Sequence, residues 1–115
     1  MNILMIDTSG PACGVAIMAD GKLVYEAELT HRQTHSQRVM PMVDTALQMS
    51  DMTAADMDVF GAVVGPGSFT GVRIGVSTVK ALAHAANKPC VAVDALEALA
   101  ANVTAFDGVV CPILD

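Results

Sequence analysis

The sequence is poor in aromatic residues, in basic residues and in long hydrophobic runs. Aromatic residues form 3% of its 115 residues, tryptophan is absent, and six Lys and Arg residues stand against twelve Asp and Glu, for a formal net charge of −6. So few scattered basic residues exclude the electrostatic footprint of tight, direct nucleic-acid binding. No apolar run approaches the roughly 18 residues of a membrane span, and the start MNILMIDTSG does not read as a signal peptide. We therefore expect a cytoplasmic protein without membrane contact.

Cysteine is also scarce, and its spacing argues against cross-links. Cys13, Cys90 and Cys111 are odd in number and form no Cys-x-x-Cys pair, so neither a disulfide framework nor a zinc site is predicted. Each lies in an apolar run and is expected to be buried. His31 and His35 have the i, i+4 spacing of a zinc helix, but no Glu follows His31 and the pair precedes the predicted helix. No metal or other cofactor is expected.

Hydrophobic residues, at 53% of the chain, are abundant enough for the core of one domain. Period-two alternation and the Asp20-Gly21 hairpin signal predict a strand meander, and a later change to helical spacing predicts alternating helices and strands. The predicted strands are 2–7, 12–18, 22–29, 59–64 and 90–93, with one more at 109–114, and the predicted helices are 36–47, 53–57, 72–86 and 94–103. The order β-β-β-α-β-α-β-α predicts an α/β fold with a mixed sheet. Because the strand at 109–114 leads into nothing, we expect the first lobe of a longer protein.

The stretch GPGSFTGVRIG at positions 65–75 resembles a phosphate-binding turn, since it joins a strand to a helix. It lacks the Gly-Lys-Ser/Thr ending of a Walker A loop, the glycine spacing of a dinucleotide fingerprint and the flanking glycines of a nucleophile elbow. The helix start still offers backbone N–H groups to an anion, although glycine conformation and helix capping explain the same residues and are favoured. A vestigial nucleotide or anion site would comprise Asp7, Thr8, Ser9, Gly65, Gly67 and Ser68.

The helix predicted over 72–86 has an apolar arc wider than one sheet face requires. Its polar residues form a single stripe of Arg73, Ser77, Lys80 and His84. The pair Gly71 and Gly75 would let another helix approach closely, and methionines cluster on the preceding helix. Docking of another protein and an internal three-layer core both fit this pattern. The predicted partner interface comprises Val39, Met40, Val43, Leu47, Gly71, Val72, Arg73, Gly75, Val76, Val79, Lys80 and Ala83.

The chain contains the segments ILMIDTSG, HSQRVMPMV, GPGSFTGVRIG and VDALEALA, in that order. Together they resemble the bacterial TsaB family, formerly YeaZ, of tRNA threonylcarbamoyladenosine biosynthesis proteins. The resemblance implies the fold of the actin, sugar kinase and heat-shock ATPase superfamily, which is ribonuclease H-like. Residues 1–108 would form its N-terminal lobe and residues 109–115 the first strand of the second. In that superfamily the first Asp-containing turn serves nucleotide phosphates, but Asp7-Thr8-Ser9-Gly10 departs from the usual order.

The resemblance also implies a function. Members of the TsaB family are noncatalytic relatives of TsaD, the transferase that modifies the adenosine beside the anticodon, and they pair with TsaD through helices of this lobe while TsaE joins the pair. This chain would then be a noncatalytic scaffold or activator that contacts tRNA only indirectly, and it could form a homodimer through the same helices. An ATP-dependent phosphotransferase using Asp7 for Mg²⁺ is the alternative, and a peptidase is a weaker one.

Overall fold

The computed structural model describes residues 1–30, 35–65 and 69–93. The elements in chain order are β1 (Asn2–Asp7), β2 (Cys13–Ala19), β3 (Lys22–Leu29), α1 (His35–Met49), a short 3-10 helix η1 (Ala54–Asp56), β4 (Val59–Val63), α2 (Phe69–Ala86) and β5 (Cys90–Val93). This order confirms the predicted succession of elements as far as β5. The helix predicted over 94–103, the strand over 109–114 and the boundary between 1–108 and 109–115 lie outside the described residues.

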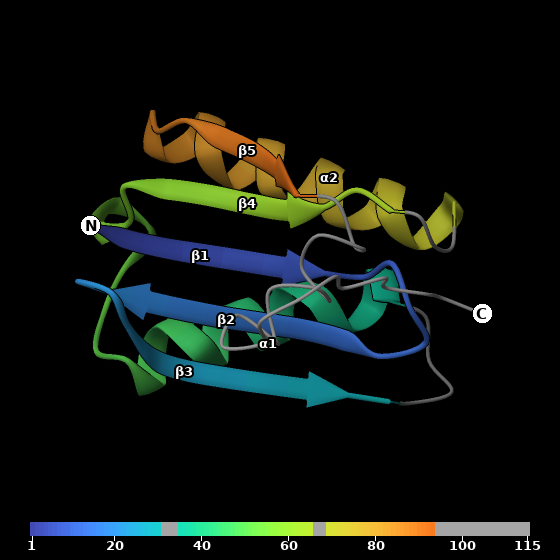
Figure 1. Cartoon of the computed structure of the whole chain (residues 1–115), viewed down its shortest axis with the longest axis horizontal. Helices are drawn as coiled ribbons and strands as arrows, with labels where there is room; N and C mark the ends of the chain where they lie inside the picture. Colours follow the sequence, from blue (N-terminus) through green and yellow to red (C-terminus); the bar gives the residue numbers. More distant parts are fainter. Residues whose placement is uncertain (31–34, 66–68, 94–115) are drawn as a thin grey trace, which may run out of the picture.

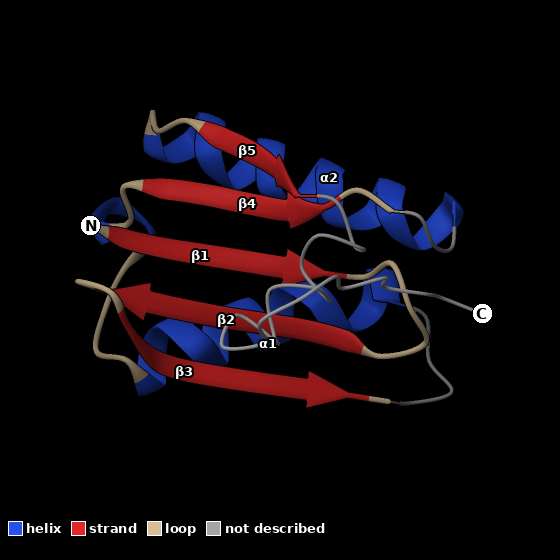
Figure 2. Ribbon diagram, viewed as in Figure 1, coloured by secondary structure: helices blue, strands red, loops and turns tan. Residues whose placement is uncertain are grey.

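The described strands form one mixed five-stranded sheet in the order β3-β2-β1-β4-β5 (Figures 1 and 2). β1, β2 and β3 pair antiparallel, as the meander predicts, whereas β4 and β5 are parallel to β1 and to each other. Both helices lie on the same face of this sheet, with α1 over β2 and β3 and α2 over β4 and β5. The carboxyl ends of β1 and β4 therefore meet at one edge of the sheet, which is also where α2 begins.

The core lies between the sheet and its helices because every second strand residue points toward them. Leu4 pairs in register with Ile17 on one side and with Phe60 on the other, and all three are fully buried. The helices contribute Val39, Val43, Ala46, Val79 and Ala83. Burying a side chain as large as Phe60 stabilises the fold by about 1.5–3 kcal/mol relative to leaving it exposed.

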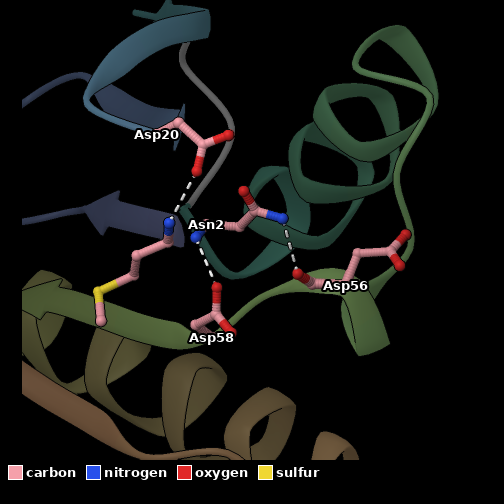
Figure 3. A network of polar contacts seen from close by, with 5 residues as sticks. Asn2, Asp20, Asp56 and Asp58 are labelled. Carbon is pink, nitrogen blue, oxygen red and sulfur yellow. Dashed lines mark hydrogen bonds and ion pairs between the residues drawn. The ribbon is translucent and has the colours of Figure 1, made fainter.

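The start of β1 is held by polar contacts to two neighbouring turns (Figure 3). The Met1 ammonium group lies 2.9 Å from a carboxylate oxygen of Asp20 in the β2–β3 turn, and this contact raises the pKa of the amine. The Asn2 backbone N–H donates to Asp58 at 2.7 Å, and the Asn2 side-chain amide donates to the carbonyl of Asp56 at 2.9 Å. Asp56 also caps the start of η1, since its carboxylate accepts the Thr53 backbone N–H at 2.8 Å.

Both long helices end in the same backbone motif. After α2, Asn87 has φ of 56°, its N–H donates to the carbonyl of His84, and the Lys88 N–H donates to that of Ala83. After α1, Asp51 has φ of 55°, its N–H donates to the carbonyl of Gln48, and the Met52 N–H donates to that of Leu47. These are Schellman motifs, closed by Asn and Asp instead of the usual glycine because these two residues tolerate the left-handed conformation.

Two helix bounds differ from the predicted ones. α2 begins at Phe69, three residues before the predicted start, so Gly71 lies inside the helix. α1 runs from His35 to Met49, beyond both ends of the predicted helix over 36–47, and it contains Pro41. Pro41 and Gln37 are exposed, so water can hydrogen-bond to the Gln37 carbonyl that lacks an N–H partner at Pro41.

The hairpin between β2 and β3 yields a test of the predicted turn. Gly21 has φ of 79°, where an alanine is strained, so Gly21→Ala in the full-length protein should cost about 1–2 kcal/mol and lower Tm by several degrees. Gly10→Ala is the matched control, because an added Cβ at either position meets nothing within 4 Å but only Gly21 has positive φ. Equal Tm values for the two variants by thermal denaturation would contradict this account of the turn.

Candidate functional site

The turn after β1 carries three of the predicted nucleotide-site residues and is stabilised from within. One carboxylate oxygen of Asp7 accepts the Ser9 backbone N–H at 2.9 Å and the Ser9 hydroxyl at 2.6 Å. Asp7 itself is exposed, whereas Ser9 is buried. The Asp7 side chain thus forms an Asx-turn, a structural role that is commoner for such an aspartate than ligand binding.

Thr8 joins this turn to α2. Its side chain is fully buried and its hydroxyl donates to the carbonyl of Gly71 at 2.5 Å, within the first turn of the helix. A Cβ added to Gly75 would lie 2.5 Å from the same hydroxyl oxygen, closer than real Cβ contacts allow. The glycine one helical turn after Gly71 therefore makes room for Thr8.

The remaining predicted nucleotide-site residues lie between β4 and α2. Gly65 is buried with φ of 113°, which confirms that the turn needs a glycine there. Gly67 and Ser68 lie outside the described residues. Within residues 1–30, 35–65 and 69–93, no group of three or more His, Cys, Asp or Glu side chains could hold a metal ion.

Half of the predicted partner-interface residues belong to this chain's own core. Val39, Val43, Val79 and Ala83 are at most 3% exposed, and Gly71 and Gly75 are also buried. They cannot directly contact a partner of the folded lobe, and the close approach at the glycine pair is made by Thr8, not by a second helix. The arc that looked too wide is used internally, since Ile74, Val76, Leu82 and Ala86 also pack against the core.

The outer surface of the two helices retains the other half of the predicted set. Met40, Arg73 and Lys80 are exposed, and Leu47, Val72 and Val76 are partly exposed. Phe69 was not among the predicted interface residues, but it is 76% exposed and the Arg73 guanidinium lies over its ring, 5.6 Å from the centroid. A helix start at position 69 would have revealed this i, i+4 pair.

The burial of the cysteines and of His84 agrees only in part with the predicted burial. Cys13 is buried as expected, and burial raises the pKa of its thiol. Cys90 is exposed on the edge strand β5, so its predicted burial is wrong. Cys111 lies outside the described residues. His84 is exposed on α2, as its place in the polar stripe predicts.

The contact between Thr8 and Gly75 gives a double-mutant test in the full-length protein. Gly75→Ala alone should destabilise the fold by about 1–3 kcal/mol, because the new methyl group overlaps a buried β-branched side chain. In a Thr8→Ala background the same change should cost little or even stabilise, since alanine is the better helix former by about 1 kcal/mol. Urea denaturation of the four proteins measures this coupling. Additive effects would show that Thr8 is not the obstacle.

The order of the strands and the position of both helices on one face of the sheet allow the fold to be compared with those of solved structures. RuvC from Thermus thermophilus, in its complex with a Holliday junction substrate, superposes with a TM-score of 0.59 over 90% of this chain and 71% of its own, at 15% identity, a likeness that concerns the fold alone. The chain thus has the ribonuclease H-like architecture that the actin-type superfamily shares, which confirms the predicted fold class.

Sequence similarity identifies the family more specifically than the fold does. The family model TsaD, described as tRNA N6-adenosine threonylcarbamoyltransferase, matches residues 28–115, so the chain belongs to the TsaD family. The tRNA threonylcarbamoyladenosine biosynthesis protein TsaB of Bacillus subtilis is 43% identical over the whole chain and 50% of its own length, and that of Escherichia coli is 42% identical over 87% of the chain and 43% of its own.

A solved structure agrees with these relatives. YeaZ from Pseudomonas aeruginosa has a TM-score of 0.78 at 36% identity and covers 83% of this chain and 44% of its own. The resemblance to the TsaB family is confirmed. The chain spans about half the length of the curated relatives it matches.

Proposed function

We propose that this chain is the N-terminal lobe of a noncatalytic subunit for tRNA threonylcarbamoyladenosine modification. It acts by binding the catalytic threonylcarbamoyltransferase, TsaD, through the outer surface of α1 and α2. TsaE would join that pair in the cytoplasm, and tRNA would be contacted only indirectly. The TsaB relatives, which are named as tRNA threonylcarbamoyladenosine biosynthesis proteins, support the pathway.

The observation that carries the proposal is the exposed apolar surface on the helices. Met40 is 41% exposed, Met49 73% and Phe69 76%, and all three lie on the helical layer. Aromatic residues and methionine are enriched in protein interfaces, and flexible thioethers adapt to a partner's shape. Packing within the lobe gives these exposed side chains no role, whereas a docking surface on the helices would give them one.

The Asp7 turn favours this proposal over an ATP-dependent phosphotransferase. The alternative needs the Asp7 carboxylate to hold a hydrated Mg²⁺ ion beside nucleotide phosphates. One oxygen of that carboxylate already accepts two hydrogen bonds from Ser9, and Thr8 is turned into the core. This geometry supports a structural turn.

Calorimetric titration of the full-length protein with TsaD tests the proposal, with Met40→Glu as the variant. A charge at this exposed apolar position of α1 should weaken binding about tenfold or more, the usual effect of losing an important interface side chain. Glutamate is a good helix former, so α1 should stay folded. Met18→Glu is the matched control, because Met18 has similar exposure, 37%, but alternates with buried Ile17 and so points away from the helices.

Equal affinities of wild type and Met40→Glu for TsaD, with unchanged Tm, would remove α1 from the interface. Substantial binding of ATP by the full-length protein would favour the phosphotransferase. A substitution at Gly75 is unsuitable as an interface probe, because it disturbs the contact with Thr8.

A further inference from the structure

Two strands of the described sheet have a free edge. The strand order β3-β2-β1-β4-β5 leaves one side of β3 and one side of β5 without a hydrogen-bonded neighbour among the described strands (Figure 1). Unpaired backbone N–H and C=O groups along such an edge can pair with a strand of another molecule. β5 has four residues, whereas β3 has eight and is the longest of the described strands. The edge of β3 is therefore the longer template for unwanted pairing.

A β-bulge interrupts the first half of this edge. The register between β2 and β3 shifts between Ile17 and Met18, and Val24 is left without a partner on β2. Leu23 and Val24 are 55% and 46% exposed, and apolar side chains of this kind suit a neighbouring strand. A bulge bends a strand and increases its twist, and natural edge strands use bulges to avoid edge-to-edge contact. Regular pairing along β3 is thus limited to the second half of the strand.

The second half of β3 carries two glutamates on one face. Glu26 and Glu28 pair in register with Ala16 and Gly14, which alternate along β2 with buried Val15. Both glutamates are exposed and project from the face of the sheet opposite the helices. In the part of the chain that the structure describes, neither has an ion-pair partner. An added strand would therefore lie beside unpaired negative charge.

A second copy of the chain would bring these charges together. If two β3 edges paired antiparallel about a two-fold axis, both copies would have their helices on the same side of the joined sheet. A register centred on Ala27 sets Glu26 opposite Glu28 twice, and a register centred on either glutamate sets that residue opposite its own copy. Directly opposed like charges destabilise a strand pair. All three registers therefore oppose self-pairing.

We propose that Glu26 and Glu28 prevent the free edge of β3 from pairing with the same edge of a second copy of this chain. The bulge at Val24 has the same effect on the first half of the strand. This role belongs to the sheet edge and does not depend on the function proposed for the helices. β5 needs no such charges, because a four-residue edge offers few hydrogen bonds.

Sedimentation velocity of the full-length protein at about 100 µM tests this role. Glu26→Gln combined with Glu28→Gln removes both charges at nearly unchanged shape. Self-association should then be about tenfold tighter than in wild type, because the opposed charge pairs are gone.

Asp44→Asn combined with Asp51→Asn is the matched control. Both aspartates are exposed and lie outside the sheet, and the change in net charge is the same. Asparagine also tolerates the positive φ of residue 51. This control should sediment as the wild type does.

A mixing experiment identifies the charges at the β3 edge as the cause. Glu26→Lys combined with Glu28→Lys should self-associate no more than wild type, because its lysines repel one another in the same registers. An equimolar mixture of this variant with wild type should associate about tenfold more tightly than either protein alone. An increase in salt from about 50 mM to about 300 mM should weaken the mixed species.

Three results would overturn the proposal. Unchanged self-association of the glutamine variant would show that the glutamates do not restrain pairing. Equal self-association of the Asp44→Asn, Asp51→Asn control would assign the effect to net charge. Tighter self-association of the glutamine variant, without a mixed species between wild type and the lysine variant, would place the contact away from the β3 edge.

Discussion

The buried hydrogen bond from Thr8 to the Gly71 carbonyl fixes where the central strand of the sheet meets α2. If the buried Thr8 hydroxyl lacked a hydrogen-bond partner, the fold would lose about 1–3 kcal/mol of stability. The hydrogen bond therefore favours the position of α2 in which it forms. That position is open because residue 75 has no side chain to displace Thr8. The glycines that first resemble phosphate chemistry therefore serve close packing, and this packing decides which side of α2 faces solvent.

Local pattern was enough to predict most of the sheet. Asp20 and Gly21 both have positive φ, as a two-residue hairpin requires, and the buried members of β1 and β2 alternate as a half-covered strand should. What could not be predicted depends on contacts between distant segments. The partner of Gly75 is 67 positions away in sequence, at Thr8, and no local rule identifies it. Cys90 was misjudged because an apolar run does not reveal that its strand lies at the sheet edge.

The same limit applies to the proposed docking surface on the helices. Helical spacing correctly places Arg73, Ser77, Lys80 and His84 on one exposed stripe, because exposure of charged and polar residues follows from solvation alone. It cannot divide the aliphatic remainder of α2 between core and surface, since valine and alanine suit both. Val79 is buried against the sheet, whereas Val76 is partly exposed, and the difference depends on which side of α2 faces the sheet. Sequence periodicity therefore identified the helix and its polar side, but it assigned to the predicted interface residues that lie in the core of the lobe.

Net charge and local charge make different contributions to partner choice. A net charge of −6 repels polyanions at long range, so an acidic chain can avoid nonspecific contact with RNA. Screening shortens that repulsion to about 8 Å at physiological salt, and at closer range the nearest side chains decide. On α2 those side chains are Arg73 and Lys80, without an acidic neighbour on the same helix. An acidic net charge together with these basic side chains on α2 is compatible with the proposed role, in which the chain acts through a protein partner and contacts tRNA only indirectly.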